Sequence, residues 1–309
     1  MTLFSIFCVL VFEQFKALPA ARLMAWQAAY AGFLARQFDA GQYRHGMIAW
    51  SVGVAGPAII IFALHWALAQ VHALLALLLS VLVLYFTVGL RQFSHFFTDI
   101  QLALRSGDID HARALLGEWR GQSAARLTSA DVARLAIEQG IVSAHRHVFA
   151  PVFWFVLLGP AGAILYRLSL GARQHSVRAL DEQTVAEGQY GEFFAKAFMV
   201  LDGVPARLTA ATFAIVGDFE DAVFCWRTQA PQWPDQASGI LLASGAGALG
   251  ARLGMPVPDA VGIETRPELG IGDDVDVEHM QSAIGLVWRA LVLCLLLLAL
   301  LTFVSWAGG

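Results

Sequence analysis

Long uninterrupted runs of apolar residues dominate the pattern along the chain. Three of these runs, residues 47–64, 71–90 and 290–306, contain no Asp, Glu, Lys or Arg. Each approaches the roughly 20 residues that a helix needs to cross the hydrocarbon core of a bilayer. The pattern therefore predicts membrane-spanning helices at these places, in preference to buried helices of a large soluble protein.

A fourth apolar run, residues 148–166, is also uncharged, but Pro151, Gly159-Pro160 and Gly162 interrupt it. Pro and Gly allow a chain to turn back inside a membrane where protein covers the freed backbone groups. We expect this run to be re-entrant or partly buried in protein. A complete crossing is the alternative, and it would place the arginines that follow the run outside the cell.

The chain begins with a shorter apolar run, MTLFSIFCVLVF. No basic residue precedes its apolar part and it has no small-residue cleavage site, so it lacks the features of a secretory signal peptide. We expect a short membrane-embedded anchor or half-helix here.

The lysines and arginines between the apolar runs predict how the chain is oriented in the membrane. Residues 91–147 contain seven arginines, whereas the link around Gln70 contains no Lys or Arg. Because basic residues are enriched in cytoplasmic loops, residues 13–46 and 91–147 are expected in the cytoplasm, with an outside turn near Gln70. If the run 148–166 is re-entrant, residues 91–289 are cytoplasmic and the last helix exits the cell.

Between the membrane segments, the apolar positions follow a helical period. Thr128 and Asp131 match a capping box, and Asp108 is placed to cap another helix. Pro205 is expected to break the helix predicted over residues 190–217.

These patterns predict an all-α fold: a polytopic helical integral membrane protein with a largely helical cytoplasmic portion. We expect three regions. Residues 1–90 form an N-terminal membrane region with a short anchor and two spans. Residues 91–289 form a helical cytoplasmic region that includes the re-entrant or partly buried run 148–166, and residues 290–309 form a C-terminal transmembrane helix.

The composition supports a lipid environment and excludes several classes of protein. Hydrophobic residues make up 58% of the chain and charged residues only 14%, against roughly a quarter charged in soluble domains. A disordered chain and a nucleic-acid binder with a basic face are excluded. Cys8, Cys225 and Cys294 are too far apart in sequence to suggest a metal knuckle or a disulfide framework. The bilayer is therefore the expected partner, and the net charge of −4 identifies no protein partner.

Common motifs of soluble enzymes are missing from the sequence. It contains no Walker loop, G-x-S-x-G, H-E-x-x-H or C-x-x-C. Gly245, Gly247 and Gly250 match G-x-G-x-x-G only superficially, because no strand precedes them and no acidic residue follows at the required distance. These glycines predict close packing of a helix.

Acidic residues gather ahead of the last helix, at Asp273, Asp274, Asp276 and Glu278. Acids at this place favour a helix N-terminus electrostatically. Metal binding by these acids is the less favoured alternative, so no metal site is predicted.

Two cationic clusters flank the uncharged run 148–166. If the run folds back, both clusters meet on one side of the membrane, where they would suit a phosphate or carboxylate group. The alternative is anchoring to anionic lipid headgroups by side chains that reach the interface. The candidate residues are His145, Arg146 and His147 before the run and Arg167, Arg173 and His175 after it.

Several segments of the chain match one family of membrane proteins. These segments are Met1–Phe4, Val9–Glu13, Ala103–Arg113, Ala136–Glu138, Ala150–Trp154, Val200–Leu208, Ala214–Gly217 and Pro267–Gly270. On these residues the chain resembles the CobD/CbiB family, and within it the AmpE-like proteins associated with β-lactamase induction. The resemblance implies a multi-pass protein of the bacterial inner membrane with most polar segments in the cytoplasm.

The resemblance also implies a reaction to be tested. CobD/CbiB synthases make adenosylcobinamide phosphate by attaching aminopropanol phosphate to a corrinoid carboxylate, an ATP-driven amide formation. Such a reaction implies ATP, and acidic residues that hold magnesium. Glu138, Asp202 and Arg207 are the polar residues that match the family at its functional positions.

Other positions differ from the synthase pattern. Alignment on neighbouring motifs places Arg146 and Arg173 where the synthases carry acidic residues, and these guanidinium groups would repel a divalent cation. We therefore expect a non-synthase protein without a cofactor, acting in envelope sensing or signalling or binding an anionic small molecule or lipid, and not an enzyme. The alternative is an adenosylcobinamide-phosphate synthase that uses ATP and magnesium.

Overall fold

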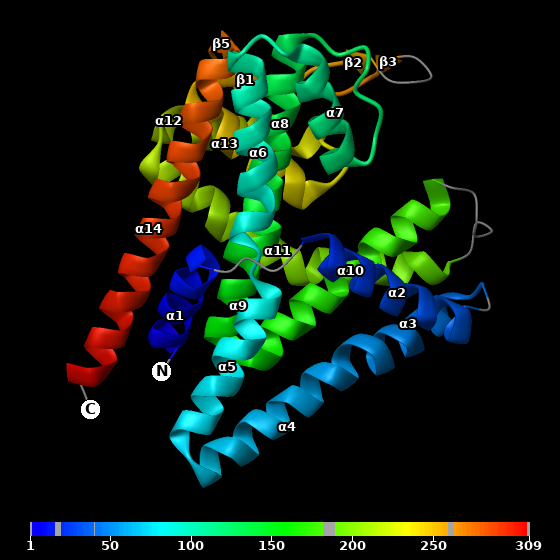
Figure 1. Cartoon of the computed structure of the whole chain (residues 1–309), viewed down its shortest axis with the longest axis vertical. Coiled ribbons are helices and arrows are strands. Elements are labelled where there is room, and N and C mark those ends of the chain that lie inside the picture. Colours follow the sequence, from blue (N-terminus) through cyan, green and yellow to red (C-terminus); the bar gives the residue numbers. More distant parts are fainter. Residues whose placement is uncertain (1, 16–19, 40, 182–188, 259–262, 308–309) are drawn as a thin grey trace. The chain divides into compact units, whose positions relative to one another are not determined.

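A computed structural model describes residues 2–15, 20–39, 41–181, 189–258 and 263–307 of the chain. These residues are predominantly helical, which confirms the predicted all-α fold (Figure 1). The chain divides into two compact units, each made from two separate segments. Unit 1 comprises Met1–Arg91 and Arg146–Asp202, and unit 2 comprises Gln92–His145 and Gly203–Gly309.

Unit 1 is built from helices only, within the residues described. Two of them continue through short π-helical segments, Ser51–Ala55 between α3 and α4, and His145–Phe149 ahead of α9. The helices are α1 (Thr2–Phe15), α2 (Ala20–Phe38), α3 (Tyr43–Trp50), α4 (Gly56–Val71), α5 (Ala73–Thr87), α9 (Ala150–Leu158), α10 (Pro160–Asp181) and the first half of α11 (Tyr190–Val216).

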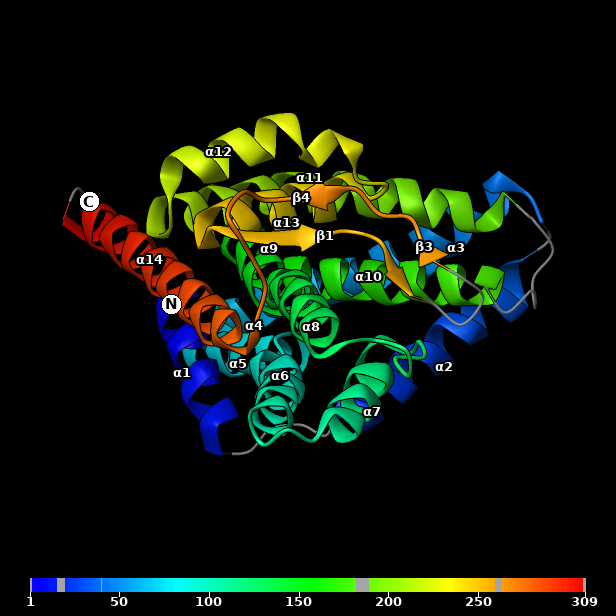
Figure 2. The ribbon, with the colours of Figure 1, turned by 90° about the horizontal axis from the view of Figure 1, so that it is seen from above.

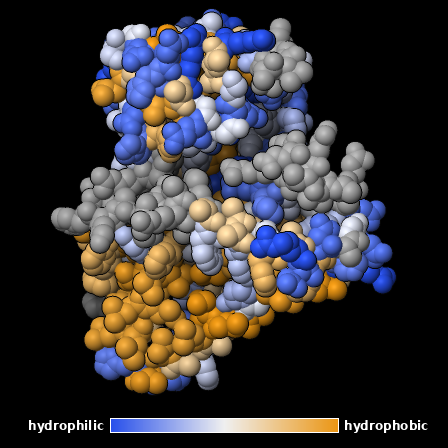
Figure 3. Space-filling view, turned by 45° about the vertical axis from the view of Figure 1, so that its right-hand side comes forward, coloured by the Kyte–Doolittle hydropathy of each residue, from blue (hydrophilic) through white to orange (hydrophobic). Residues whose placement is uncertain are grey.

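The helices α4 and α5 form an antiparallel hairpin with a strongly apolar surface (Figure 1). Side chains such as Ile60, Trp66 and Leu78 are more than half exposed on it, and hydrophobic colour covers this part of the molecule in Figure 3. Such a continuous apolar surface is stable against lipid and unfavourable in water. The helix α5 covers only the middle of the predicted span 71–90, because the chain is extended at His72 and again at Val88.

The apolar run 148–166 contains a sharp turn between two helices. Gly159 ends α9 with a φ of +64°, a conformation that favours glycine, and Pro160 begins α10. A Cβ atom at Gly162 would lie 2.1 Å from the carbonyl oxygen of Trp154, so α9 and α10 approach closely just after the turn. Whether this segment enters the bilayer stays a prediction.

Unit 2 combines helices with a few very short strands. Its helices are α6 (Leu90–Arg105), α7 (Ile109–Arg120), α8 (Ser129–Ala144), α12 (Phe219–Thr228), α13 (Gln236–Leu249) and α14 (Val277–Ala307), together with the second half of α11. Its strands are β1 (Ala251–Gly254), β2 (Val257–Pro258), β3 (Ile263–Glu264), β4 (Glu268–Leu269) and β5 (Asp273–Asp274).

The strands of unit 2 pair in two small sheets that the sequence pattern did not predict. In one sheet, β1 lies between an antiparallel β4 and a parallel β5, and Figure 2 shows β1 beside β4. In the other, β2 pairs with β3. Strands of two to four residues carry too few alternating positions to give a sequence signal.

The helix α13 is the most completely buried helix described in unit 2, since every residue from Ala237 to Ala248 is buried. A Cβ atom at Gly247 would lie 2.4 Å from the carbonyl oxygen of Asp221, and one at Gly245 would lie 2.9 Å from Ile141. The prediction of helix packing is confirmed for Gly245 and Gly247, whereas Gly250 has no close neighbour and ends α13 with a φ of +63°.

The predicted helix starts are confirmed, but one predicted break is wrong. Thr128 and Asp131 form both bonds of the capping box, and Asp108 accepts a hydrogen bond from the backbone amide of His111. By contrast, α11 runs through Pro205 without ending. A proline removes one backbone hydrogen bond, and packing on both sides of the position can offset that loss.

Four helical segments in the described residues are long and apolar enough to cross a membrane. Two of them, Tyr43–Val71 and Val277–Val304, contain the predicted spans 47–64 and 290–306 almost entirely. The other two, Ser129–Leu158 and Tyr190–Val216, were not predicted as spans. Both carry polar residues at intervals, which shorten the apolar runs in the sequence.

Candidate functional site

A buried hydrogen bond between two polar side chains marks the candidate site in unit 1. The hydroxyl of Tyr166 on α10 donates to Oδ1 of Asp202 on α11, at 2.6 Å. The two side chains are 0% and 1% exposed. Burial of a carboxylate is costly unless its charge is compensated, so this arrangement requires cationic or donor groups close by.

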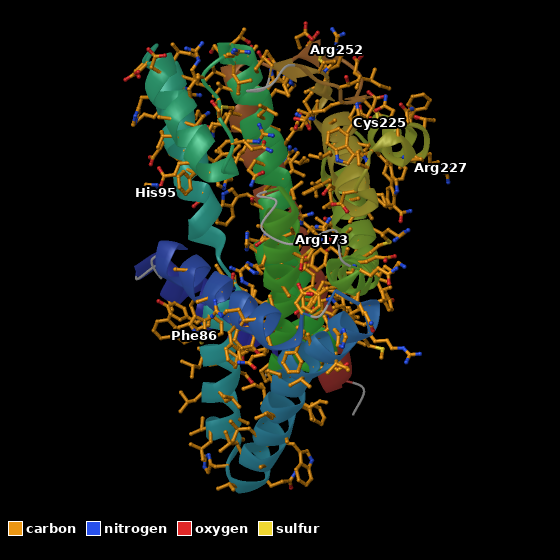
Figure 4. All side chains as sticks on the ribbon, turned by 90° about the vertical axis from the view of Figure 1, so that its right-hand side faces the viewer. Phe86, His95, Arg173, Cys225, Arg227 and Arg252 are labelled. Atoms are coloured by element: carbon orange, nitrogen blue, oxygen red, sulfur yellow. The ribbon has the colours of Figure 1, made fainter. Side chains whose placement is uncertain are left out.

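Aromatic residues form one wall of this site. The ring centroids of Tyr166 and Phe198 lie 5.5 Å apart, and Trp154 donates a hydrogen bond to the backbone oxygen of Leu201, one residue before Asp202. The guanidinium carbon of Arg173 lies 5.1 Å from the centroid of the Phe198 ring, and Figure 4 labels this arginine. Arg173 therefore shares the aromatic wall on which Tyr166 packs.

A π-helical segment brings a further arginine and a histidine to the site. Arg146 and His147 lie in the π-helix His145–Phe149, and the His147 ring contacts the guanidinium of Arg167. The backbone oxygen of His147 accepts a hydrogen bond from the amide of Gly89 at 3.1 Å, which fixes this segment within unit 1. Insertions of this kind in α-helices occur frequently at functional sites.

Arg167 is charged at neutral pH although it is buried. Burial lowers the pKa of Arg167 to about 10, which still leaves its guanidinium protonated. Burial, and then Asp202, raise the pKa of Tyr166 well above its ordinary value of 10.0, while Arg146 and Arg167 act to lower it. Tyr166 thus keeps its proton and donates a hydrogen bond to Asp202, and Arg146 and Arg167 are close enough to influence the phenol.

We call Arg146, His147, Tyr166, Arg167, Arg173 and Asp202 the arginine cluster. All six residues belong to unit 1. The cluster combines three guanidinium groups with one carboxylate, so cations outnumber anions among its members. Chemically, it can bind a phosphate or carboxylate group, because guanidinium groups offer forked donors that match these anions. Anion binding at this place stays a prediction.

The remaining predicted site residues lie elsewhere. His175 is on α10 with its ring near Gly32 of α2. His145 belongs to unit 2, where its Nδ1 is 3.0 Å from the hydroxyl of Thr209. Arg207 is exposed in unit 2 and donates to the backbone oxygen of Gly203.

Glu138 forms a separate buried ion pair in unit 2. Its carboxylate pairs with Arg266, and the two side chains are each 8% exposed. Its other oxygen accepts a hydrogen bond from the amide of Gly254 at 2.9 Å, and the Arg266 guanidinium lies over the ring of Trp233. These contacts make Glu138 a support for the turn after β1. Of the three polar residues that match the family, only Asp202 lies in the arginine cluster.

Sequence reasoning did not select Tyr166 or Arg266 as site residues. Tyr166 sits at the end of an apolar run, where a tyrosine is an ordinary interfacial residue. Arg266 is 128 residues from Glu138, and only the fold joins them. One feature of the sequence could have indicated Tyr166: it is the last residue of the apolar run 148–166 and directly precedes the candidate residue Arg167.

The ligand set of the arginine cluster does not fit a divalent cation. Magnesium is held by carboxylate oxygens, usually together with substrate phosphates and waters, and the cluster supplies a single carboxylate among three guanidinium groups. Within the described ranges, no group of three or more His, Cys, Asp and Glu side chains is placed to hold a metal ion. The residues of the arginine cluster therefore do not form a magnesium site.

Comparison with known proteins places the chain in a family. The family described as CobD/Cbib protein matches residues 10–287. The chain belongs to the CobD/CbiB family. One similar protein, named cobalamin biosynthesis protein CobD, comes from Stutzerimonas stutzeri. It is 34% identical over 260 residues, which cover 84% of this chain and 82% of the relative. No solved structure matches.

Two further relatives carry the same name. The protein from Chromobacterium violaceum is 34% identical over 252 residues, which cover 78% of each chain. The protein from Mycobacterium tuberculosis strain H37Rv is 28% identical over 192 residues, which cover 59% of each chain.

These relatives overturn the expected non-synthase function. The prediction of envelope sensing or signalling is wrong, because relatives at 34% identity over most of the chain are named for cobalamin biosynthesis. An AmpE-like membership is likewise without support beyond the shared family. The physical error was to infer loss of the synthase reaction from arginines that would repel a divalent cation, although guanidinium groups can themselves bind the phosphates of the substrates.

Proposed function

We propose that this chain is an adenosylcobinamide-phosphate synthase of cobalamin biosynthesis. In this reaction the amine of aminopropanol phosphate forms an amide with a carboxylate of adenosylcobyric acid, and the oxygen lost from that carboxylate leaves in the phosphate products of ATP. The observation that carries the proposal is the family match over residues 10–287, together with relatives at 34% identity named for cobalamin biosynthesis.

The arginine cluster supports the proposal through its charge. Aminopropanol phosphate, ATP and the corrinoid carboxylates are all anions, and the cluster presents three guanidinium groups beside a buried aromatic wall. Electrostatic attraction is stronger there than in bulk water, because the surroundings are less polarisable. We assign Asp202 and Tyr166 to hold the guanidinium groups in place, since their hydrogen bond is buried and Tyr166 feels the charges of Arg146 and Arg167.

The proposed setting is the bacterial inner membrane, with the polar segments in the cytoplasm. Four helical segments long and apolar enough to span support a membrane location. The orientation rests on the distribution of Lys and Arg, which favours residues 13–46 and 91–147 on the cytoplasmic side. ATP and corrinoid precursors would then reach the protein from the cytoplasm.

A complementation experiment tests the proposed function. A strain that lacks its own synthase and depends on cobalamin is given adenosylcobyric acid and a plasmid with this chain. We expect growth with the chain and none with the empty plasmid, whereas added cobinamide, which bypasses the step, restores both. Absence of growth on adenosylcobyric acid, with the protein present in the membrane, would exclude the synthase function.

The variant Asp202→Ala links the complementation to the site. Removal of this carboxylate leaves guanidinium groups buried without its compensating charge, so we expect loss of growth. The exposed Arg36→Gln, on α2 of the same unit, is the matched control, because Arg36 has no assigned place in the site, and it should grow as the wild type does.

A further inference from the structure

The arginine cluster has the charge that a bound phosphate needs and lacks the ligands that a metal ion needs. Arg167 is 4% exposed and contacts His147. Arg173 lies against Phe198, which packs on Tyr166. Arg146 and Arg167 both act on the Tyr166 phenol. Arg146 and Arg167 are thus near Tyr166, and Arg173 lies against the Phe198 ring that packs on Tyr166.

We propose that Arg146, Arg167 and Arg173 bind the phosphate of the aminopropanol phosphate substrate directly, without a divalent cation. This inference rests on the proposed synthase function, because that function supplies the phosphate monoester. The guanidinium groups take the charge-neutralising role that magnesium has in many phosphate sites.

Guanidinium groups are suited to this role in a buried site. They present several N–H donors in a fixed plane, so a pair of them can contact two or three phosphate oxygens at once. They are also more weakly hydrated than a metal ion, and burial against an aromatic wall costs them less. Asp202 holds a negative charge beside them, which stabilises the cluster when no phosphate is bound.

Phospholipid headgroups share the phosphate chemistry and are the other source of such a ligand. A headgroup is a phosphodiester at the membrane surface, whereas aminopropanol phosphate is a monoester with more negative charge. The burial of Arg167 and the aromatic wall favour a small ligand that enters the protein over a headgroup at the surface.

Isothermal titration of the full-length protein tests the inference. The protein is held in phosphatidylcholine nanodiscs with EDTA, and aminopropanol phosphate is titrated into it. We expect saturable binding, no binding of aminopropanol without its phosphate, and an affinity that added magnesium changes by less than twofold. A requirement for magnesium, or equal binding of aminopropanol, would overturn the inference.

Variants identify the residues that bind. Arg146→Gln and Arg173→Gln should each weaken binding at least tenfold, while Arg173→Lys, which keeps the charge, should weaken it less. Arg36→Gln is the matched control, because Arg36 is an exposed arginine on α2 of the same unit. Thermal unfolding of each variant shows whether it is folded, and wild-type affinity in folded Gln variants would contradict the assignment.

A lipid arm and the growth assay separate the remaining outcomes. Nanodiscs that contain phosphatidylglycerol should leave the affinity unchanged; competition by this lipid would show a headgroup site and overturn the inference. If complementation fails while metal-independent phosphate binding persists, the synthase function is lost and the phosphate site remains. If complementation succeeds but binding requires magnesium, the synthase function is supported and the metal-independent phosphate site is excluded.

Discussion

Tyr166 is the residue on which the geometry of the arginine cluster depends. Its hydroxyl makes a 2.6 Å hydrogen bond to a carboxylate that is 1% exposed. The sequence pointed to the arginines near it, because charged residue types can be identified from the sequence without knowledge of the fold. It did not point to Tyr166, since only the fold shows that this tyrosine is buried against Asp202.

Tyr166→Phe removes this hydrogen bond while keeping the ring. Loss of a buried donor to a charged acceptor should lower the free energy of unfolding by about 1–3 kcal/mol. We expect a lower thermal unfolding midpoint in detergent and weaker binding of aminopropanol phosphate. Tyr85→Phe, on a half-buried tyrosine of α5 in the same unit, is the control; equal midpoints for the two variants would contradict a special role for Tyr166.

Asp276 predicts a pH effect at the start of α14. Its Oδ1 accepts hydrogen bonds from the amides of Glu278 and His279 at 2.9 and 3.0 Å. The bond from the His279 amide, followed by that from its side chain, lowers the pKa of Asp276 below its ordinary value of 3.8. A lowered pKa means that the stabilisation is present above the ordinary value and is lost as the pH falls through the lower, folded value.

We therefore expect hydrogen-exchange protection of the first turn of α14 to fall below about pH 4. Asp276→Asn should keep a capping oxygen and remove this pH dependence, because asparagine is also a good N-cap and does not titrate. Protection factors measured between pH 3 and 6 check this. The same pH profile in both proteins would show that Asp276 is not the titrating group.

At the level of elements, close packing of α13 is the feature most sensitive to added volume. A Cβ atom at Gly247 would lie 2.4 Å from a backbone oxygen of α12, which cannot move without shifting that helix. We expect Gly247→Ala to destabilise unit 2 by about 1–3 kcal/mol, as overpacking usually does. A lower thermal unfolding midpoint is the measurement.

Gly285 is the matched control for this substitution. It lies in α14 of the same unit, and a Cβ atom there has nothing within 4 Å. Gly285→Ala should be neutral or slightly stabilising, because alanine favours the helix by about 1 kcal/mol over glycine. Similar losses in both variants would mean that packing at Gly247 is not the cause.

The sequence predicted those elements whose signals are local. Uncharged runs located the apolar helices around residues 47–64 and 290–306, and the capping residues Asp108 and Thr128 located helix starts. It failed where tertiary contacts decide. Pro205 is tolerated inside α11, and the strands of unit 2 are too short for periodicity to reveal them. The π-helix at His145–Phe149 has no sequence signature, although it places Arg146 and His147 in the site.

At the scale of the whole molecule, the distribution of basic residues predicts which side of the membrane each polar segment faces. A single cysteine introduced at Gln70, in a chain with its native cysteines replaced by serine, should react with a membrane-impermeant maleimide added to intact spheroplasts. A cysteine at Gln122, in the turn after α7, should react only after the membrane is opened. Labelling of Gln122→Cys in intact spheroplasts would reverse the proposed orientation.

The family assignment concerns the whole molecule, and it supports a proposed reaction for a protein whose site lacks the expected metal ligands. Relatives at 34% identity are named for cobalamin biosynthesis, whereas the comparison of single residues led to a non-synthase prediction. Single positions in a site can change while the fold and the charge needed for the substrate are retained. Here arginines stand where carboxylates were expected, and they suit an anionic substrate.

Product formation by the purified protein is the most direct test. The full chain in nanodiscs is incubated with adenosylcobyric acid, aminopropanol phosphate, ATP and magnesium. The corrinoids are then separated, and their masses are measured by mass spectrometry. We predict a new corrinoid with the mass of adenosylcobinamide phosphate, formed only with the active protein and ATP. Unchanged adenosylcobyric acid, under conditions in which a CobD relative forms the product, would contradict the account.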